Sequence, residues 1–143
     1  MLQSKVIRLV LAGMLALTGI AQTASAADKV KEKVLFQVSD DNPKTWNQTL
    51  NVIGNVQEAY GKENVEIKLV AFGLGLGILK LESVAGGRVK EALQGGVRIL
   101  ACENTMQRQK ITKADMLPDI DYVKAGVVEI IASERQGWAV IRP

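Results

Sequence analysis

Short apolar runs alternate with longer helix-compatible stretches along most of this 143-residue chain, and this alternation constrains the fold more than any other feature. Runs of this length are typical of buried strands, and strands separated by helical stretches favour a parallel sheet covered by helices. The sequence therefore predicts one three-layer α/β/α domain with a mostly parallel sheet of about five strands. The predicted strands are residues 34–38, 65–72, 97–101, 126–131 and 138–141.

The clearest predicted helix begins at Pro43 and ends at Gly61. Proline fits the first turn because the N–H that it lacks would have no helical partner there, and Asp41 or Asn42 is the expected cap. Glycine is the residue type that most often ends a helix. Apolar residues recur between these limits at steps of three and four, which is the spacing of one buried stripe. They are Trp46, Leu50, Ile53, Val56 and Tyr60.

Three further helical segments are predicted between the later strands. Residues 84–93 follow Ser83, a candidate cap, and residues 103–109 are polar and compatible with a helix. Thr112 and Asp115 have the spacing of a capping box, in which the side chain of each residue accepts a hydrogen bond from the backbone N–H of the other. We therefore expect one more short helix to begin at Thr112.

The first 26 residues have the pattern of a secretory signal peptide. Lys5 and Arg8 supply the positive start, residues 9–21 carry no charge, and Ala24-Ser25-Ala26 supplies small residues at a cleavage site. A membrane anchor is the alternative, but the uncharged run is shorter than the roughly 20 apolar residues that a spanning helix needs. Cleavage after Ala26 leaves residues 27–143 as a single domain, and it predicts a periplasmic protein with no membrane attachment.

Export also changes how the charge of the chain is interpreted. Cleavage removes Lys5 and Arg8 and lowers the formal net charge from +3 to +1. A nearly neutral chain with no basic run and 4% aromatic residues lacks the features of a nucleic-acid-binding protein. The sequence predicts no nucleic-acid partner.

Two residue counts restrict the chemistry. The chain has no histidine, which excludes Ser-His-Asp and Cys-His catalysis and any histidine-ligated metal site. It has one cysteine, Cys102, so no disulfide can form within the chain in an oxidising compartment. The sequence predicts neither a metal site nor a cofactor.

Cys102 lies where the predicted strand 97–101 ends and a helix-compatible segment begins. Ligands and reacting groups of open α/β sheets lie at the carboxyl ends of strands. A helix that begins here would direct free N–H groups at the sulfur and lower the pKa of the thiol, whereas neighbouring Glu103 would oppose this and Arg108 is about two turns away. The other interpretation is a small buried apolar residue, because free cysteine is among the most buried residue types.

Other candidate ligand-binding residues surround the same predicted sheet edge. Gly73, Gly75 and Gly77 follow the second strand and form either a cradle for an anion or a tight turn, but their spacing matches no nucleotide-binding motif. Asp40 follows the first strand. It is a candidate for a proton-transfer group, a cation ligand or a helix cap. Asn104 and Thr105 are candidates to hydrogen-bond a sulfur ligand or the start of a helix.

The segment 96–106, Gly-Val-Arg-Ile-Leu-Ala-Cys-Glu-Asn-Thr-Met, resembles the central segment of the DsrE/DsrF-like proteins. Residues 34–40, 70–73 and 126–131, followed by Gln136-Gly137-Trp138, agree with this family in order. The resemblance implies a flavodoxin-like sandwich that assembles as a homotrimer or homohexamer. It also implies sulfur relay, in which Cys102 would carry sulfur as a persulfide between donor and acceptor proteins.

The sequence departs from the family in two ways, and three hypotheses for its function therefore stay open. Phe72 stands where related sequences often have histidine, and the relay proteins of the family are cytoplasmic whereas this chain has a predicted export signal. The first hypothesis is an exported, sulfurtransferase-like carrier that holds a persulfide on Cys102. The second is a non-catalytic oligomeric binding module with a structural cysteine, and the third is a redox sensor that forms an intermolecular disulfide.

Overall fold

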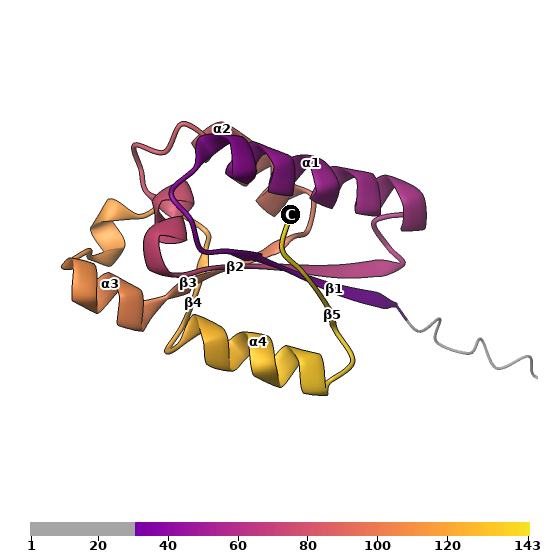
Figure 1. The fold of residues 1–143 in the computed structure, drawn as a ribbon. Helices are drawn as coiled ribbons and strands as arrows, with labels where there is room; N and C mark the ends of the chain where they lie inside the picture. Colours follow the sequence, from indigo (N-terminus) through magenta and orange to yellow (C-terminus); the bar gives the residue numbers. More distant parts are fainter. Residues whose placement is uncertain (1–30) are drawn as a thin grey trace, which may run out of the picture.

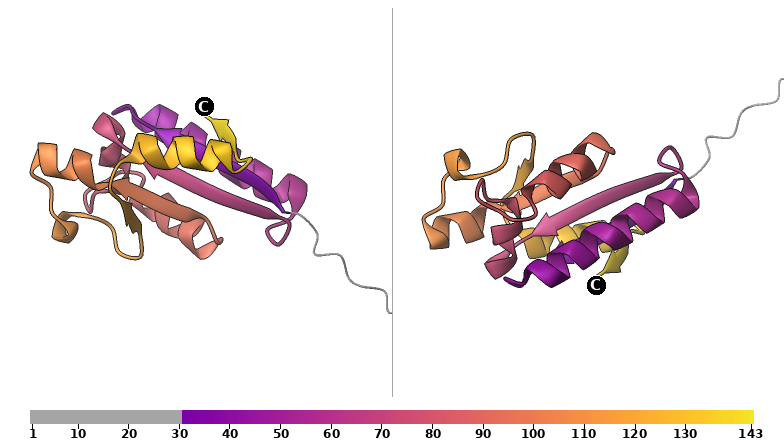
Figure 2. Two further views of the ribbon diagram at one scale, coloured as in Figure 1. Left: turned by 90° about the horizontal axis from the view of Figure 1, so that it is seen from below. Right: turned by 90° about the horizontal axis from the view of Figure 1, so that it is seen from above.

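The computed structural model describes residues 31–143, which fold around one five-stranded sheet (Figure 1, Figure 2). The strands lie in the order β4-β3-β2-β1-β5, and every neighbouring pair is parallel. The predicted α/β class and parallel sheet are confirmed, while the predicted signal peptide lies outside the described residues. The elements are β1 (Glu32–Val38), α1 (Pro43–Tyr60), β2 (Val65–Ala71), η1 (Gly73–Leu79), α2 (Gly86–Gln94), β3 (Arg98–Cys102), α3 (Glu103–Gln109), η2 (Lys113–Asp115), β4 (Asp121–Val123), α4 (Gly126–Arg135) and β5 (Ala139–Ile141).

Helices α1 and α2 cover one face of the sheet and α4 covers the other (Figure 1, Figure 2). The chain steps across the sheet from β1 to β4 in one direction and then returns past β1 to form β5. Right-handed crossovers in opposite directions place their helices on opposite faces, which explains why only α4 lies on the second face. The result is the three-layer sandwich that the alternation of elements predicts.

Two apolar cores fill the spaces between these layers. The larger core lies on the side of α1 and α2 and includes Phe36 and Leu69, which have no exposed surface. The smaller core lies beneath α4 and contains Leu35, Val70 and Leu100. Alternate residues of each strand therefore contribute to opposite cores, as the two-residue period of a strand requires.

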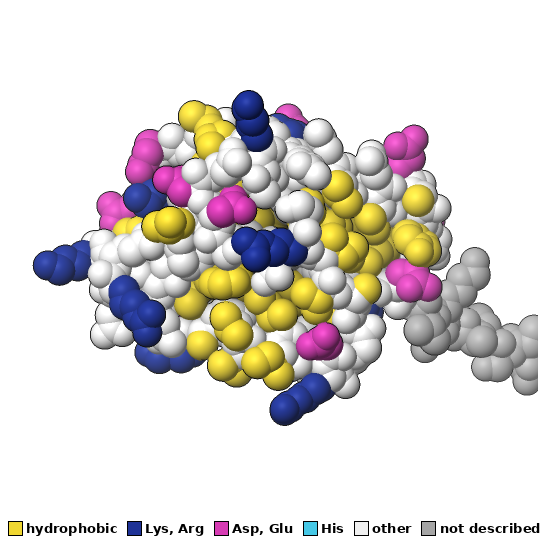
Figure 3. All heavy atoms as spheres, viewed as in Figure 1, with side chains coloured by type: hydrophobic (Ala, Val, Ile, Leu, Met, Phe, Trp, Pro, Cys, Tyr) yellow, Lys and Arg dark blue, Asp and Glu magenta, His cyan; other side chains and the backbone are white. Residues whose placement is uncertain are grey.

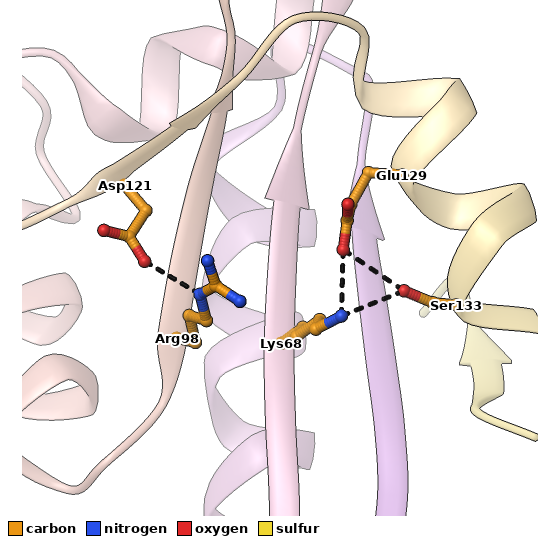
Figure 4. A network of polar contacts seen from close by, with 5 residues as sticks. All are labelled: Lys68, Arg98, Asp121, Glu129 and Ser133. Atoms are coloured by element: carbon orange, nitrogen blue, oxygen red, sulfur yellow. Dashed lines mark hydrogen bonds and ion pairs between the residues drawn. The ribbon is translucent and has the colours of Figure 1, made fainter. Parts of the chain in front are cut away.

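A buried charge lies beneath α4 beside the smaller core. Lys68 of β2 is 8% exposed, and its Nζ lies 2.8 Å from the Glu129 carboxylate and 3.1 Å from the Ser133 hydroxyl (Figure 4). The same ammonium lies 4.2 Å from the centre of the Trp138 ring. A buried cation is tolerated only with such partners, so these contacts tie α4 and the segment before β5 to the sheet.

Helix α1 matches the prediction at both ends. The Asn42 side chain accepts a hydrogen bond from the Lys44 N–H at 3.0 Å, and Pro43 occupies the first turn. Gly61 follows the helix with φ of +83°, a backbone conformation that favours glycine. The stripe packs Trp46 and Ile53 into the larger core, whereas Tyr60 at the end of the helix is exposed.

The predicted strand at residues 126–131 is wrong, because this run forms the first part of α4. The fourth strand is the short β4, which precedes α4 and lies outside the predicted strands. A short apolar run fits a strand or a buried helix equally well by periodicity. The structure shows the helical spacing, because Glu129 and Ser133 lie four residues apart and both bind Lys68.

The segment around the glycine loop also differs in detail from the prediction. Residues predicted as a turn form the 3₁₀ helix η1, and α2 begins at Gly86 rather than two residues earlier. Ser83 accepts a hydrogen bond from the Ala85 N–H within a turn and does not cap α2 directly. The predicted capping box is confirmed, since Thr112 and Asp115 bracket η2 with hydrogen bonds of 2.8 Å.

Within residues 31–143, none of the helices combines the length and the apolar character that crossing a bilayer requires.

Candidate functional site

Cys102 ends β3 and immediately precedes α3, which is the position that the sequence predicts. Its side chain is only 5% exposed, and it faces α4 on the same side of the sheet as Leu100. Cys102 therefore lies at the carboxyl edge of the sheet, where parallel α/β folds hold their reacting groups.

The first residue of α4 supplies a direct hydrogen bond to the sulfur. The Gly126 N–H donates to Cys102 Sγ at 3.3 Å. Glycine suits this close approach, because a Cβ at this position would lie 3.1 Å from Phe72 Cβ and 3.2 Å from Val70 Cγ1. The first N–H groups of a helix have no partner within it and carry partial positive charge, so the start of α4 favours the thiolate.

Thr105 connects the cysteine to the glycine segment. Its hydroxyl oxygen accepts the Gly73 N–H at 3.0 Å, and the Thr105 hydroxyl lowers the pKa of Cys102 through a hydrogen bond. Gln109 donates to the Gly73 carbonyl oxygen at 3.0 Å, so both backbone groups of Gly73 are held by α3. These bonds hold α3 against Gly73, beside Cys102.

The hydrogen bonds at the sulfur outweigh the effect of burial on the thiol. Burial raises the pKa of Cys102. Hydrogen bonds from Thr105, Gly126 and Asn104 lower it by more, so the pKa lies below the ordinary value for cysteine. The Asn104 N–H also donates to the Lys124 carbonyl oxygen at 3.1 Å. The site stabilises a thiolate without histidine.

A cavity of about 230 Å³ adjoins the sulfur. Its walls combine the apolar side chains of Phe72 and Val127 with polar side chains from α3. Arg108 is the one charged residue that lines it among the described residues. The cavity is therefore weakly cationic and has no acidic group to donate or accept a proton.

The structure brings together only some of the predicted site residues. Cys102, Gly73, Asn104 and Thr105 all line this cavity. Gly75, Gly77 and Asp40 do not line it.

Each of the three outlying residues has a packing contact instead. A Cβ at Gly75 would overlap the Val38 carbonyl oxygen, and one at Gly77 would lie 3.0 Å from the Trp46 ring. The backbone carbonyl oxygen of Asp40 accepts the Trp46 Nε1–H at 2.8 Å. The buried side-chain Oδ1 of Asp40 has no partner among the described residues. These contacts favour the tight-turn interpretation of the glycines over an anion cradle.

Gly126 is the site residue that sequence reasoning missed. The predicted fourth strand includes Gly126 and would direct its N–H into the sheet rather than at Cys102. A glycine directly before an apolar run is also compatible with the close-packed start of a helix, and this signal was available in the sequence. The described residues contain no cluster of three or more histidine, cysteine or acidic side chains arranged to hold a metal ion.

Replacing Thr105 with valine should raise the pKa of Cys102, because valine keeps the shape of the side chain but cannot donate to the sulfur. Only the thiolate reacts with alkylating reagents, and its fraction falls as the pH drops through the pKa. The midpoint of the pH–rate profile for alkylation should therefore move to higher pH. Thr105→Ser retains the hydroxyl and should keep the native midpoint, whereas an unchanged midpoint in the valine variant would remove Thr105 from this role.

Comparison with known proteins finds solved structures of the same fold. No protein-family model matches the chain, and no curated protein matches it. The protein of unknown function MTH1491 from Methanobacterium thermoautotrophicum matches at 30% identity with a TM-score of 0.76, covering 79% of this chain and 100% of that one.

Two more distant structures share the fold at lower identity. The ychN protein from E. coli matches at 10% identity with a TM-score of 0.62, covering 77% of this chain and 99% of that one. The conserved protein of unknown function BT1422 from Bacteroides thetaiotaomicron matches at 16% identity with a TM-score of 0.64, covering 77% and 93%. Because the present chain is 30% identical to MTH1491 and spans all of it, the protein belongs to the same family, the DsrE-like fold family.

Proposed function

We propose that the protein carries sulfane sulfur as a persulfide on Cys102. The observation that carries this proposal is the 3.3 Å hydrogen bond that the Gly126 N–H donates to Cys102 Sγ beside a cavity. A thiolate is the nucleophilic form of cysteine, and the same donor suits the terminal anionic sulfur of a persulfide. The lack of histidine argues against a hydrolytic nucleophile.

The proposed loading step needs no external oxidant. The Cys102 thiolate attacks the outer sulfur of a hydropersulfide, RSSH, and a new S–S bond forms as the donor S–S bond breaks. The departing RS⁻ takes the proton of the donor and leaves as RSH, while Cys102 retains an S–S⁻ group. Attack by an acceptor thiolate on that outer sulfur returns Cys102 to its starting form.

Treatment with an alkyl hydropersulfide should add one sulfur, about 32 Da, to the intact mass of the protein. The added mass should disappear with a thiol reductant, and Cys102→Ser should not acquire it, because serine cannot form the S–S bond. Cys102→Ser replaces only the buried sulfur atom with oxygen. Circular dichroism of this variant checks that it keeps the wild-type fold. An unmodified wild-type mass after treatment with the donor would contradict the proposal.

The burial of the sulfur supports a second candidate function. Cys102 is 5% exposed, as expected of a structural cysteine in a non-catalytic binding module. Slow alkylation of the folded protein that quickens only on unfolding would favour this alternative. The same burial argues against the redox-sensor hypothesis, since two buried sulfurs cannot approach each other without local opening.

We further propose that the protein functions in the periplasm as a homotrimer or homohexamer and exchanges sulfur with partner proteins. The support for assembly is an exposed apolar stripe on α4, formed by Val127, Val128 and Ile131, where Figure 3 shows hydrophobic side chains gathered at the surface. Light scattering of the purified protein measures the subunit number. The mass of the exported chain measures whether cleavage occurs after Ala26.

A further inference from the structure

Helix α4 meets strand β2 at two places, and Cys102 lies at the first of them. Gly126, at the start of the helix, packs against the end of β2 and donates its N–H to Cys102 Sγ at 3.3 Å. Glu129 and Ser133 lie about one and two turns further along and bind Lys68 on β2. The position of the helix along the strand therefore decides whether the Gly126 N–H reaches the sulfur.

The apolar contacts of α4 do little to set that position. Among the described residues, Ile130 is the one side chain of α4 that packs into the smaller core, whereas Val127, Val128 and Ile131 are exposed. Apolar packing is not directional, but a hydrogen bond requires a narrow range of distance and angle. The polar contacts with Lys68 are therefore the ones that fix α4 along β2.

Lys68, Glu129 and Ser133 form a closed polar cluster, here called the Lys68 cluster (Figure 4). The Glu129 Oε1 accepts from Lys68 Nζ at 2.8 Å and from the Ser133 hydroxyl at 3.3 Å, and the last two groups lie 3.1 Å apart. Lys68 is 8% exposed and Ser133 is 1% exposed. A buried ion pair is costly to separate, because each charge would lose its partner where water does not replace it. The cluster therefore resists movement of α4 along β2.

From these contacts we infer that the Lys68 cluster positions the hydrogen-bond donor of the Cys102 site. It holds α4 at the point along β2 where the Gly126 N–H meets the sulfur. The inference rests on the proposed function, in which this N–H stabilises the thiolate that accepts sulfur. The three residues of the cluster are positioning residues, since none of them lines the cavity beside the sulfur.

A charge effect of the cluster and a positioning effect have opposite signs. Loss of Glu129 alone would leave the Lys68 ammonium uncompensated, and a nearby cation lowers the pKa of a thiol. Loss of the Gly126 hydrogen bond would raise that pKa. Lys68→Met with Glu129→Leu removes one charge of each sign, so its effect on Cys102 reports the position of α4. The other charged residues near the sulfur are unchanged in this double variant; they are Glu103, Arg108 and Lys124.

Alkylation of Cys102 by the neutral reagent iodoacetamide tests the inference. The midpoint of the pH–rate profile follows the pKa of the thiol, whereas accessibility changes only the plateau rate. In the double variant the midpoint should move to higher pH. The thiolate fraction at a fixed pH below the midpoint should fall about tenfold, as expected for the loss of one hydrogen bond to a charged group. The ultraviolet absorbance of the thiolate should show the same shift without a reagent.

Two further variants separate positioning from a merely structural role. Ser133→Ala loosens the cluster without changing any charge, and it should move the midpoint in the same direction by a smaller amount. Leu50→Ala removes a buried side chain of α1 on the opposite face of the sheet and destabilises the protein without touching α4 (Figure 1). Its midpoint should equal that of wild type. Circular dichroism checks that each variant is folded.

A double-variant midpoint equal to or below that of wild type would overturn the inference, and so would an equal upward shift in Leu50→Ala. Loading of wild type with an alkyl hydropersulfide tests the proposed function separately. No gain of about 32 Da together with a raised midpoint in the double variant would overturn persulfide carriage and leave the positioning role standing. A gain of this mass with an unchanged midpoint would overturn the positioning role alone.

Discussion

Gly75→Ala should destabilise the protein by about 3 kcal/mol, because the added methyl group meets backbone rather than a movable side chain. A Cβ at Gly75 would overlap the Val38 carbonyl oxygen and would lie 2.6 Å from the Ser39 nitrogen. These atoms end β1, and β1 pairs with both β2 and β5. Relief of the clash would require η1 to move away from the sheet, and η1 buries Leu76 and Ile78 in the larger core.

Denaturant unfolding measures this loss of stability, and two other glycines supply a matched control. Gly54 in α1 and Gly87 in α2 have no atom within 4 Å of the position that a Cβ would take. Alanine in a helix lowers the entropy of the unfolded chain and raises helix propensity, so each control variant should gain about 0.5–1 kcal/mol. A Gly75→Ala variant as stable as these controls would show that η1 is not held closely against the end of β1.

Glu129→Leu should destabilise the protein by about 2–4 kcal/mol, because it leaves the buried Lys68 ammonium without its counter-ion. The two groups lie 2.8 Å apart, and their side chains are 11% and 25% exposed (Figure 4). The Ser133 hydroxyl and the Trp138 ring would remain as partners of Lys68. Neither carries a negative charge, so neither replaces the carboxylate.

A double variant separates the cost of an unpaired charge from the contribution of the pair. Lys68→Met with Glu129→Leu removes both charges and should recover most of the stability lost in Glu129→Leu, since buried pairs are often replaceable by apolar residues. Asp121→Asn is the exposed control. It breaks the Arg98–Asp121 pair, whose side chains are 59% and 55% exposed, and should change stability by less than about 1 kcal/mol. Equal losses in Glu129→Leu and Asp121→Asn would contradict the buried-charge argument.

Strong local signals explain which parts of the fold could be predicted from the sequence. Pro43, the apolar stripe and Gly61 define α1 without reference to the rest of the chain, and the run that ends at Cys102 predicts β3. The short β4 has no comparable signal, because it spans only Asp121–Val123 and none of its residues is fully buried. Its strand conformation is stabilised by pairing with β3, which places Tyr122 opposite Ala101.

Some residues of the candidate site could also be predicted from the sequence, and others could not. Cys102, Asn104 and Thr105 are close in sequence, so one motif predicts all three. Gly126 lies 24 positions from Cys102 and reaches it only because α4 packs on that face of the sheet. The sequence places Arg108 about two turns along the predicted helix, and only the tertiary structure shows that it lines the cavity.

The sequence by itself determined the parallel α/β class, the main helix and the identity of the single thiol, because these depend on periodicity, capping residues and residue counts. Only the tertiary structure decided that residues 126–131 are helical, since an apolar run of that length satisfies a strand and a helix equally until its neighbours are known. The helical conformation of residues 126–131 also determines the environment of Cys102. As the start of α4, Gly126 presents a free N–H to the sulfur, whereas in a central strand that N–H would have been bonded within the sheet.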